Sequence, residues 1–290
     1  MIRKAVIPAA GWGTRFLPAT KAQPKETLPL FDRPMIHYIV EEAAAAGIRQ
    51  IIMVTALGKR AIEDYFDRSY ELEQLLQAKG DEKRLAEVRR ISEMAEVVYV
   101  RQREQLGLGH AILTAKDLVG NEPFAVFLPD DVVEAKVPAI RQLLDVYERY
   151  RCSVLAVERV PDCDVGRYGI IQGREVGERT FQIERLVEKP KLNEAPSNLA
   201  VIGRYILTPD VFTMLERARP GAIGEIQLTD GLEALLGQQN IYAYEYEGVR
   251  HDGGTPLGLL KASVAIALNR PDVGGEFRQW LHGLLAGAPR

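Results

Sequence analysis

The chain has 290 residues, of which 47% are hydrophobic and 27% are charged, and its formal net charge is −3. This length and composition are ordinary for a globular protein with one large α/β domain. The small negative charge provides no basic surface for nucleic acid, and no apolar run approaches the roughly 20 residues that cross a bilayer. No secretory leader pattern is present, and the two cysteines, Cys152 and Cys163, lack metal-binding spacing. We therefore expect a cytoplasmic protein in which neither cysteine takes part in chemistry.

The first 160 residues alternate short β-rich runs with amphipathic helical stretches, which predicts a mostly parallel sheet covered by helices. Strands are expected at 4–7, 50–54, 97–100, 124–128 and 153–157, and helices at 34–47 and about 109–118. Pro34 suits a first helical position, and Gly47 suits a helix end. Residues 69–96 are rich in Glu, Lys, Arg, Gln and Leu, and this composition favours a helical hairpin inserted on the outside.

The pattern changes after Val160, where glycine-containing loops alternate with short strands through about Leu207. Helices are expected near 209–218, 228–237 and 256–268, and an amphipathic segment at 273–286 follows. We find no internal repeat, low-complexity segment or flexible linker. The sequence therefore predicts one domain over 1–290, a doubly wound, mostly parallel mixed sheet with a Rossmann-like core. A first part (1–160), a smaller β-rich part (161–270) and a C-terminal helix (271–290) make up this domain.

The loop that follows the first strand, Ala9-Ala10-Gly11-Trp12-Gly13-Thr14-Arg15-Phe16-Leu17-Pro18, is the most informative segment. Its glycines let backbone N–H groups approach a phosphate chain closely, because no Cβ is in the way. A dinucleotide-binding turn is excluded, since Phe16 replaces the third glycine and Pro18 and Pro24 prevent the long helix that such a turn begins. A P-loop is excluded because G-x-x-x-x-G-K-[ST] is absent. A solvated basic loop is one alternative, but three cations beside glycine amides suit a triphosphate better: Arg15, Lys21 and Lys25.

Two more segments carry polar side chains where expected strands end. Leu128-Pro129-Asp130-Asp131 places two carboxylates after a buried strand, where they need a cation to bind or a helix to cap. Mg²⁺ is held by one or two carboxylates together with substrate phosphates. The run from Arg101 to Ala111 is a strand end, a polar loop and a glycine-led helix start, which is where doubly wound sheets bind ligands. The amide of Gln102 offers a donor and an acceptor that match the imide edge of uracil, and the alternative is that Gln102 is a plain surface residue. His110 can simply sit at the helix start.

The loop resembles the G-x-G-T-R-…-P-K signature of the sugar-phosphate nucleotidylyltransferases. The fuller run through Pro18-Ala19-Thr20-Lys21 and Lys25-Glu26-x-Leu28-Pro29 resembles the bacterial UTP–glucose-1-phosphate uridylyltransferases within that family. Matching blocks follow in order from residue 2 to about residue 270. The resemblance implies UTP and glucose 1-phosphate as substrates, UDP-glucose and pyrophosphate as products, Mg²⁺ as cofactor, and a homo-oligomer, a dimer or a tetramer. It also implies that 1–160 binds the nucleotide and 161–270 the sugar phosphate.

The same resemblance implies a role for each matching position. Arg15, Lys25 and Lys189 are the implied catalytic cations, and Asp130 and Asp252 the implied metal ligands. The implied nucleotide-binding residues are Ala9, Ala10, Gly11, Gly13, Thr14, Glu26, Gln102 and Gly107. The implied sugar-phosphate-binding residues are Gly169, Glu188, Lys189 and Glu225, while Asp230 can serve structure. One position departs from the family, because Gly253 stands where relatives usually have cysteine, and this leaves the carboxylate of Asp252 untouched.

Two other functions stay open. A dTTP-dependent glucose-1-phosphate thymidylyltransferase has the same scaffold, but such enzymes usually carry Gln at the position of Glu26 and lack the 69–96 insertion. A non-catalytic subunit that senses sugar nucleotides would be expected to lose the metal carboxylates or the loop cations. From the residues alone, Asp252 can also be a capping residue and Lys189 part of a plain turn. The apolar residues of the last segment can pack on their own domain or form a subunit interface: Phe277, Trp280, Leu281, Leu284 and Leu285.

Overall fold

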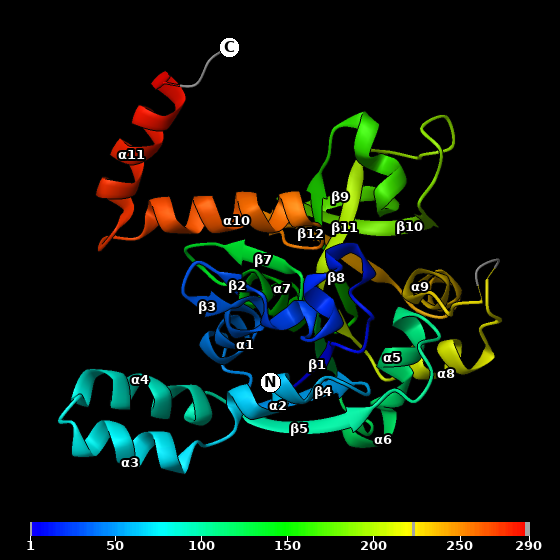
Figure 1. The fold of residues 1–290 in the computed structure, drawn as a ribbon. Coiled ribbons are helices and arrows are strands. Elements are labelled where there is room, and N and C mark those ends of the chain that lie inside the picture. The colour runs from blue at the N-terminus through cyan, green and yellow to red at the C-terminus, as the bar shows by residue number, and fades with distance from the viewer. Residues whose placement is uncertain (1, 222–223, 288–290) are drawn as a thin grey trace.

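The computed structural model of the chain describes residues 2–221 and 224–287. Its centre is a nine-stranded sheet, which Figure 1 shows. In spatial order the strands are β5 (Glu96–Arg101), β4 (Gln50–Thr55), β1 (Lys4–Pro8), β6 (Phe124–Phe127), β11 (Leu199–Leu207), β8 (Ser153–Arg159), β12 (Ile241–Glu245), β10 (Thr180–Glu188) and β9 (Gly169–Gly177). Two short ribbons lie apart from this sheet: β2 (Pro29–Leu30) with β3 (Arg33–Pro34), and β7 (Asp131–Glu134) with β13 (Val249–Asp252).

The five strands predicted in the first 160 residues are confirmed, and the four of them that neighbour one another are parallel, as predicted. For the whole domain the prediction of a mostly parallel sheet is wrong. Among the neighbours in the nine-stranded sheet, β5–β4, β4–β1, β1–β6 and β8–β12 are parallel. The other four pairs are antiparallel. The difference arises in the second half, where β9 and β10 are joined by a two-residue turn that reverses the chain. Alternating hydrophobic residues predict a strand but do not give its direction.

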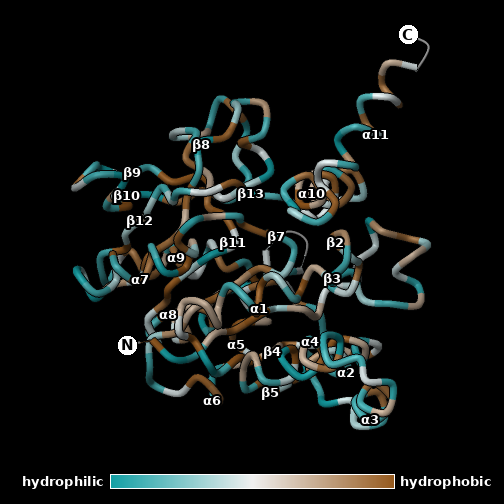
Figure 2. The backbone as a smooth tube through the Cα atoms, turned by 90° about the vertical axis from the view of Figure 1, so that its left-hand side faces the viewer, coloured by the Kyte–Doolittle hydropathy of each residue, from teal (hydrophilic) through white to brown (hydrophobic). Residues whose placement is uncertain are grey.

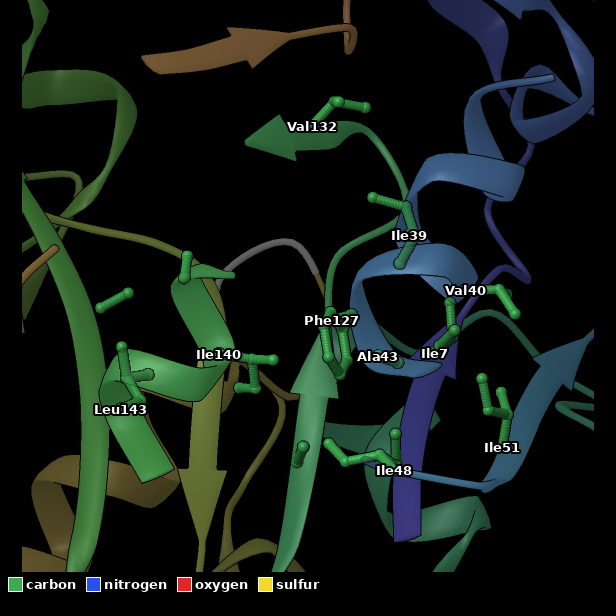
Figure 3. Packing of buried hydrophobic residues seen from close by; sticks show 14 of the residues in the cluster. Ile7, Ile39, Val40, Ala43, Ile48, Ile51, Phe127, Val132, Ile140 and Leu143 are labelled. Atoms are coloured by element: carbon green, nitrogen blue, oxygen red, sulfur yellow. The ribbon is translucent and has the colours of Figure 1, made fainter. Parts of the chain in front are cut away.

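Helices cover both faces of the sheet and enclose two hydrophobic cores. On one face lie α1 (Met35–Ala45), α2 (Arg60–Phe66), α7 (Ala139–Tyr150) and α10 (Pro256–Asn269), and on the other α5 (Leu108–Thr114), α8 (Asp210–Arg217) and α9 (Leu228–Leu236). Successive side chains of a strand point into different cores: in β4, Met53 lies in the first core and Ile52 in the second. Figure 3 shows the first core, where Val40 of α1 lies beside Ile7 of β1 and Ile39 points toward Val132 of β7.

The predicted insertion is a helical hairpin of α3 (Tyr70–Ala78) and α4 (Glu82–Glu93), and the next strand begins at Glu96. The predicted helix at 109–118 is interrupted at Ala115, which separates α5 from α6 (Lys116–Val119). The C-terminal helix is α11 (Gly274–Gly287), which extends from α10 away from the body of the molecule in both views (Figures 1 and 2), and residues 288–290 lie outside the described part. No helix of the described residues is long and apolar enough to span a membrane.

Candidate active site

The loop after β1 folds through three short 3₁₀ turns, Thr14–Phe16, Ala19–Lys21 and Lys25–Thr27, and contains no long helix. Gly13 has a φ of +68°, and a Cβ there would lie 3.3 Å from the Cβ of Lys25. The hydroxyl of Thr20 donates to the carbonyl oxygen of Gly13 at 2.8 Å and closes the loop. Glycine is therefore needed for the loop to fold back onto Lys25.

Two cavities open beside this loop, at the ends of β1, β5 and β6. The loop cavity, of about 430 Å³, lies against the loop after β1, and the strand cavity, of about 470 Å³, lies against β9 and β10. Predicted site residues in the loop cavity are Ala10, Gly11, Gly13, Thr14, Lys25, Glu26, Gln102, Gly107, Asp130 and Glu225. Those in the strand cavity are Arg15, Asp130, Gly169, Glu188, Lys189 and Asp252. Asp130 lines both cavities, so a group bound between the two would lie against this carboxylate.

A buried carboxylate forms part of the wall of the loop cavity. Glu26 is fully buried, and its Oε2 accepts from the ammonium of the buried Lys59 at 2.7 Å. Its other oxygen, Oε1, has no hydrogen-bond partner among the described residues. Burial raises the pKa of Glu26 even though Lys59 and Lys25 oppose the shift. Because a buried acceptor without a partner is costly, Oε1 is positioned to accept a hydrogen bond from a ligand in the cavity.

Gln102 and Gly107, two of the predicted base-reading residues, lie together in the wall of the loop cavity. The amide nitrogen of Gln102 donates to the carbonyl oxygen of Gly107 at 3.2 Å and lies 2.9 Å from Nδ1 of His110. Gly107 has a φ of +97°, and a Cβ there would lie 2.8 Å from the carbonyl oxygen of Ile226. His110 thus orients Gln102, a role that the sequence did not indicate. Glu225 lies beside Gly107 and lines the loop cavity, so its predicted contact with the sugar stays a prediction.

The two predicted metal ligands converge on Gly254. A Cβ at Gly254 would lie 3.0 Å from Oδ1 of Asp252, 3.3 Å from Oδ2 of Asp130 and 3.8 Å from Nη1 of Arg15. The absence of a side chain at Gly254 thus leaves a space that both carboxylates border. Among the described residues no cluster of three or more acidic, His or Cys side chains forms a metal site. Two carboxylates with an open space beside them fit Mg²⁺, because this ion takes its remaining ligands from water and substrate phosphates.

Each of these carboxylates has a cationic neighbour. The ammonium of Lys25 lies 2.5 Å from Oδ2 of Asp130. Burial would raise the pKa of Asp130, but Lys25 outweighs that effect and lowers it. Burial lowers the pKa of Lys25 in turn, and the anionic Asp130 and Glu26 more than compensate and raise it. The guanidinium of Arg167 lies 3.0 Å from Oδ2 of Asp252. The ionised form of Asp130 is therefore favoured, and Asp252 is paired with a guanidinium.

The strand cavity carries its own polar group near the end of β10. Oε1 of Glu188 lies 3.0 Å from the ammonium of Lys189, and its Oε2 accepts from the hydroxyl of Thr229 at 2.6 Å. Lys189 has a φ of +44°, which is uncommon for a residue with a side chain and frequent at functional sites. A Cβ at Gly169 would lie 3.3 Å from Oε2 of Glu188. Backbone, carboxylate and ammonium thus meet in one place, as hydroxyl and phosphate recognition requires.

The structure brings nearly all predicted site residues to these two cavities. Ala9 is fully buried and lines neither cavity, and Lys21, the third cation of the loop, lines a neighbouring cavity instead. Sequence reasoning missed three residues, Arg167, Thr229 and Arg250, which hold Asp252, Glu188 and Asp131 respectively. The only signal for them was their position beside or within a predicted block.

A mixed sheet with a glycine-rich loop after its first strand and two cavities that adjoin at an aspartate is an α/β protein with a ligand-binding site at the ends of its strands. Residues 4–268 match the Nucleotidyl transferase family, and the chain belongs to that family. The UTP--glucose-1-phosphate uridylyltransferase of Staphylococcus epidermidis is 52% identical over 283 residues, which cover 98% of each chain.

Solved structures agree with this family. A UDP-glucose pyrophosphorylase complexed with UDP-glucose has a TM-score of 0.86 and 46% identity, covering 93% of this chain and 100% of that one. The UTP-bound UGPase from Acinetobacter baumannii has a TM-score of 0.89 and 43% identity, covering 97% and 99%. A putative glucose-1-phosphate thymidylyltransferase from Bacillus anthracis, at 24% identity and a TM-score of 0.72 over 92% and 96%, shares the fold alone.

Proposed function

We infer that this chain transfers the uridylyl group of UTP to glucose 1-phosphate and releases UDP-glucose and pyrophosphate. The observation that carries this conclusion is the 52% identity over almost the whole chain to a UTP–glucose-1-phosphate uridylyltransferase. Two cavities that adjoin at Asp130 agree with a reaction that joins two substrates. The Glu26 position, where thymidylyltransferases usually carry Gln, is occupied by a carboxylate with a free acceptor. The metal carboxylates and loop cations, which a sensing subunit would lose, are in place.

The reaction needs no base. A phosphate oxygen of glucose 1-phosphate is already anionic, and it forms a bond to the α-phosphorus of UTP. The bond from that phosphorus to the oxygen bridging to the β-phosphate breaks, and pyrophosphate leaves with its electron pair. Catalysis then consists of bringing two anions together and stabilising the charge on the leaving group.

The side chains of the two cavities can perform this work. UTP would lie in the loop cavity, with its base against Gln102 and Gly107 and a polar group of the nucleoside donating to Glu26. Arg15 and Lys25 would neutralise its phosphates and the departing pyrophosphate. Glucose 1-phosphate would lie in the strand cavity, with its hydroxyls on Glu188 and the backbone at Gly169, and its phosphate on Lys189. The α-phosphate would then lie beside Asp130, where the two cavities meet.

Mg²⁺ would be held by the carboxylates of Asp130 and Asp252 on the open side of Gly254. When bound there, it supplies positive charge that polarises the phosphate oxygens. Lys25 lowers the pKa of Asp130 and so favours the ionised form that a metal requires, and Arg167 pairs with Asp252.

A nucleotide panel tests the proposed function. Purified protein is mixed with glucose 1-phosphate, Mg²⁺ and one of UTP, dTTP, CTP, ATP or GTP, and the release of pyrophosphate is measured. We expect strong release with UTP and little with the others. Preference for dTTP would assign the chain to thymidylyl transfer. No release from folded protein that still binds UDP-glucose would indicate a sensing subunit.

We also propose that the chain self-associates through α11. Among the described elements, only α10 packs extensively against this helix. Three of its large apolar side chains are exposed: Trp280, Leu284 and Leu285. These side chains recur at helical spacing, so a second helix can cover them. Sedimentation velocity should show a dimer or a tetramer, and Trp280→Glu with Leu284→Glu should dissociate it. A monomeric unaltered chain would refute this proposal without affecting the proposed activity.

A further inference from the structure

The ribbon of β7 and β13 carries both proposed metal ligands. β7 begins at Asp131, directly after Asp130, and β13 ends at Asp252. The strands are antiparallel, with Asp131 opposite Asp252. The amide of Gly253 donates to the carbonyl oxygen of Asp130 at 2.7 Å. A two-stranded ribbon is only marginally stable by itself, and this one packs on α1 and α10. The side chains that join its two strands then help to set the separation of the two carboxylates.

Asp131 is buried, and it is tied to its surroundings through three oxygens. Oδ2 accepts from the amide of Gly203 at 2.9 Å, and Oδ1 accepts from Nε of Arg250 at 2.8 Å. Its carbonyl oxygen accepts from the fully buried guanidinium of Arg204 at 2.7 Å. A Cβ at Gly203 would lie 2.7 Å from Oδ2, so only glycine permits this approach. The second aspartate of the Asp130-Asp131 pair is therefore engaged with the protein itself.

Arg250 reaches Asp131 from the opposite strand, two residues before Asp252. Its Nη2 lies 2.7 Å from Oδ1 of Asp131, and the two side chains are only 10% and 8% exposed. Its Nη1 donates to Oε1 of Glu158 at 2.8 Å and to the hydroxyl of Tyr168 at 3.2 Å. One planar guanidinium thus joins β13 to β7, to β8 and to the segment before Gly169. A lysine could not hold this geometry, because its single ammonium lacks the rigid fork.

We propose that Asp131 and Arg250 are a positioning pair, which fixes the separation of the Asp130 and Asp252 carboxylates and thereby sets the affinity for the divalent metal. The inference rests on the proposed metal-binding function of those carboxylates. The pair crosses the ribbon immediately beside both of them, and its low exposure leaves it weakly screened by solvent. Partners that orient metal ligands in this way typically contribute about 10- to 100-fold to metal affinity.

Mn²⁺ binding tests the positioning pair without relying on turnover. Free Mn²⁺ is followed by its electron paramagnetic resonance signal in protein saturated with UDP-glucose, and UDP-glucose alone gives the background. Arg250→Met removes the fork, Arg250→Lys keeps only the charge, and Asp131→Asn removes the partner. We expect the Kd for Mn²⁺ to rise about 10- to 100-fold in Arg250→Met and Asp131→Asn, and less in Arg250→Lys. The KM for UTP and for glucose 1-phosphate at saturating metal should change much less.

Glu73→Gln is the matched control. It also converts a buried carboxylate that accepts from two arginines into an amide, but it lies in the α3–α4 hairpin. It should lower stability and leave Mn²⁺ affinity unchanged. Wild-type Mn²⁺ binding in both Asp130→Asn and Asp252→Asn would refute the metal site and the positioning pair with it. Loss of Mn²⁺ in those two, with wild-type affinity in folded Arg250→Lys and Asp131→Asn, would refute the positioning pair alone. If Arg250→Met does not fold by circular dichroism, these two milder variants decide.

Discussion

Replacing Lys25 with methionine tests the electrostatic account of the site most directly. The ammonium of Lys25 lies 2.5 Å from Oδ2 of Asp130, and the side chains of this pair are 19% and 24% exposed. Lys25 also lines the loop cavity, where the phosphates of UTP would lie. Methionine is unbranched and only one atom shorter than lysine, and it carries no charge, so the loss reports mainly on charge rather than on packing.

Two effects of this substitution can be given magnitudes. Loss of one charged donor from a water-excluded site costs about 3 kcal/mol of transition-state stabilisation. At about 1.4 kcal/mol for each tenfold change in rate, kcat/KM should fall roughly 100-fold or more. Breaking a fully buried ion pair costs about 3–5 kcal/mol, and this partly exposed pair should lose less, about 1–3 kcal/mol of unfolding free energy. The folded protein therefore remains, with poor turnover.

Pyrophosphate release at several UTP and glucose 1-phosphate concentrations measures the first effect, and urea denaturation measures the second. Lys116→Met is the matched control, because Lys116 and Glu216 also form a 2.5 Å pair but are 43% and 46% exposed and line neither cavity. It should change kcat/KM by less than about threefold and stability by less than about 1 kcal/mol. A folded Lys25→Met protein within fivefold of the unaltered kcat/KM would refute the role assigned to Lys25.

Three further predictions follow from other features. Gly107→Ala should weaken UTP binding in calorimetry, because φ is +97° and the new Cβ would lie 2.8 Å from the carbonyl oxygen of Ile226; unchanged affinity would contradict this. Hydrogen bonds from Arg68 and Arg89 lower the pKa of Glu73 to about 2. In urea denaturation, the unaltered chain should therefore be more stable than Glu73→Gln by a constant amount above about pH 4.5, and this difference should vanish as the pH falls toward 2. A difference that does not change with pH would contradict this prediction. EDTA should abolish pyrophosphate release and excess Mg²⁺ should restore it, and full activity in EDTA would remove the metal from the mechanism.

Much of the fold could be predicted because the strands of the first half are short apolar runs bounded by glycine, proline or charge. Ile51 to Val54 is such a run, and both faces of β4 are buried, as parallel strands require. The β7–β13 ribbon was missed for the opposite reason. Val249 to Asp252 is only partly buried and mixes charge with apolar residues, so it shows no period of two. Asp131 and Arg250, which join its two strands, lie 119 positions apart in the chain.

The site divides in the same way between local and long-range information. The loop cations and glycines follow one another within a few residues, so the sequence alone favours a phosphate site over a solvated basic loop. Arg167 and Thr229 carry no such local pattern. Their importance arises from 3.0 Å and 2.6 Å contacts with Asp252 and Glu188, at sequence separations of 85 and 41 residues. The spacing of residues in a single sequence does not reveal which side chains so far apart in the chain come into contact.

Most of the predicted polar ligands of this site are held in place by a second residue. Among the predicted polar ligands, Asp130 is held by Lys25, Asp252 by Arg167, Gln102 by His110 and Glu188 by Thr229. Because the attacking phosphate needs no base, rate enhancement must come from positioning charged groups around the reacting atoms. A charged side chain keeps its position only if neighbouring residues restrain it. The residues that touch substrate can therefore be inferred from type and position, whereas those that give the site its precision become visible only when the chain is folded.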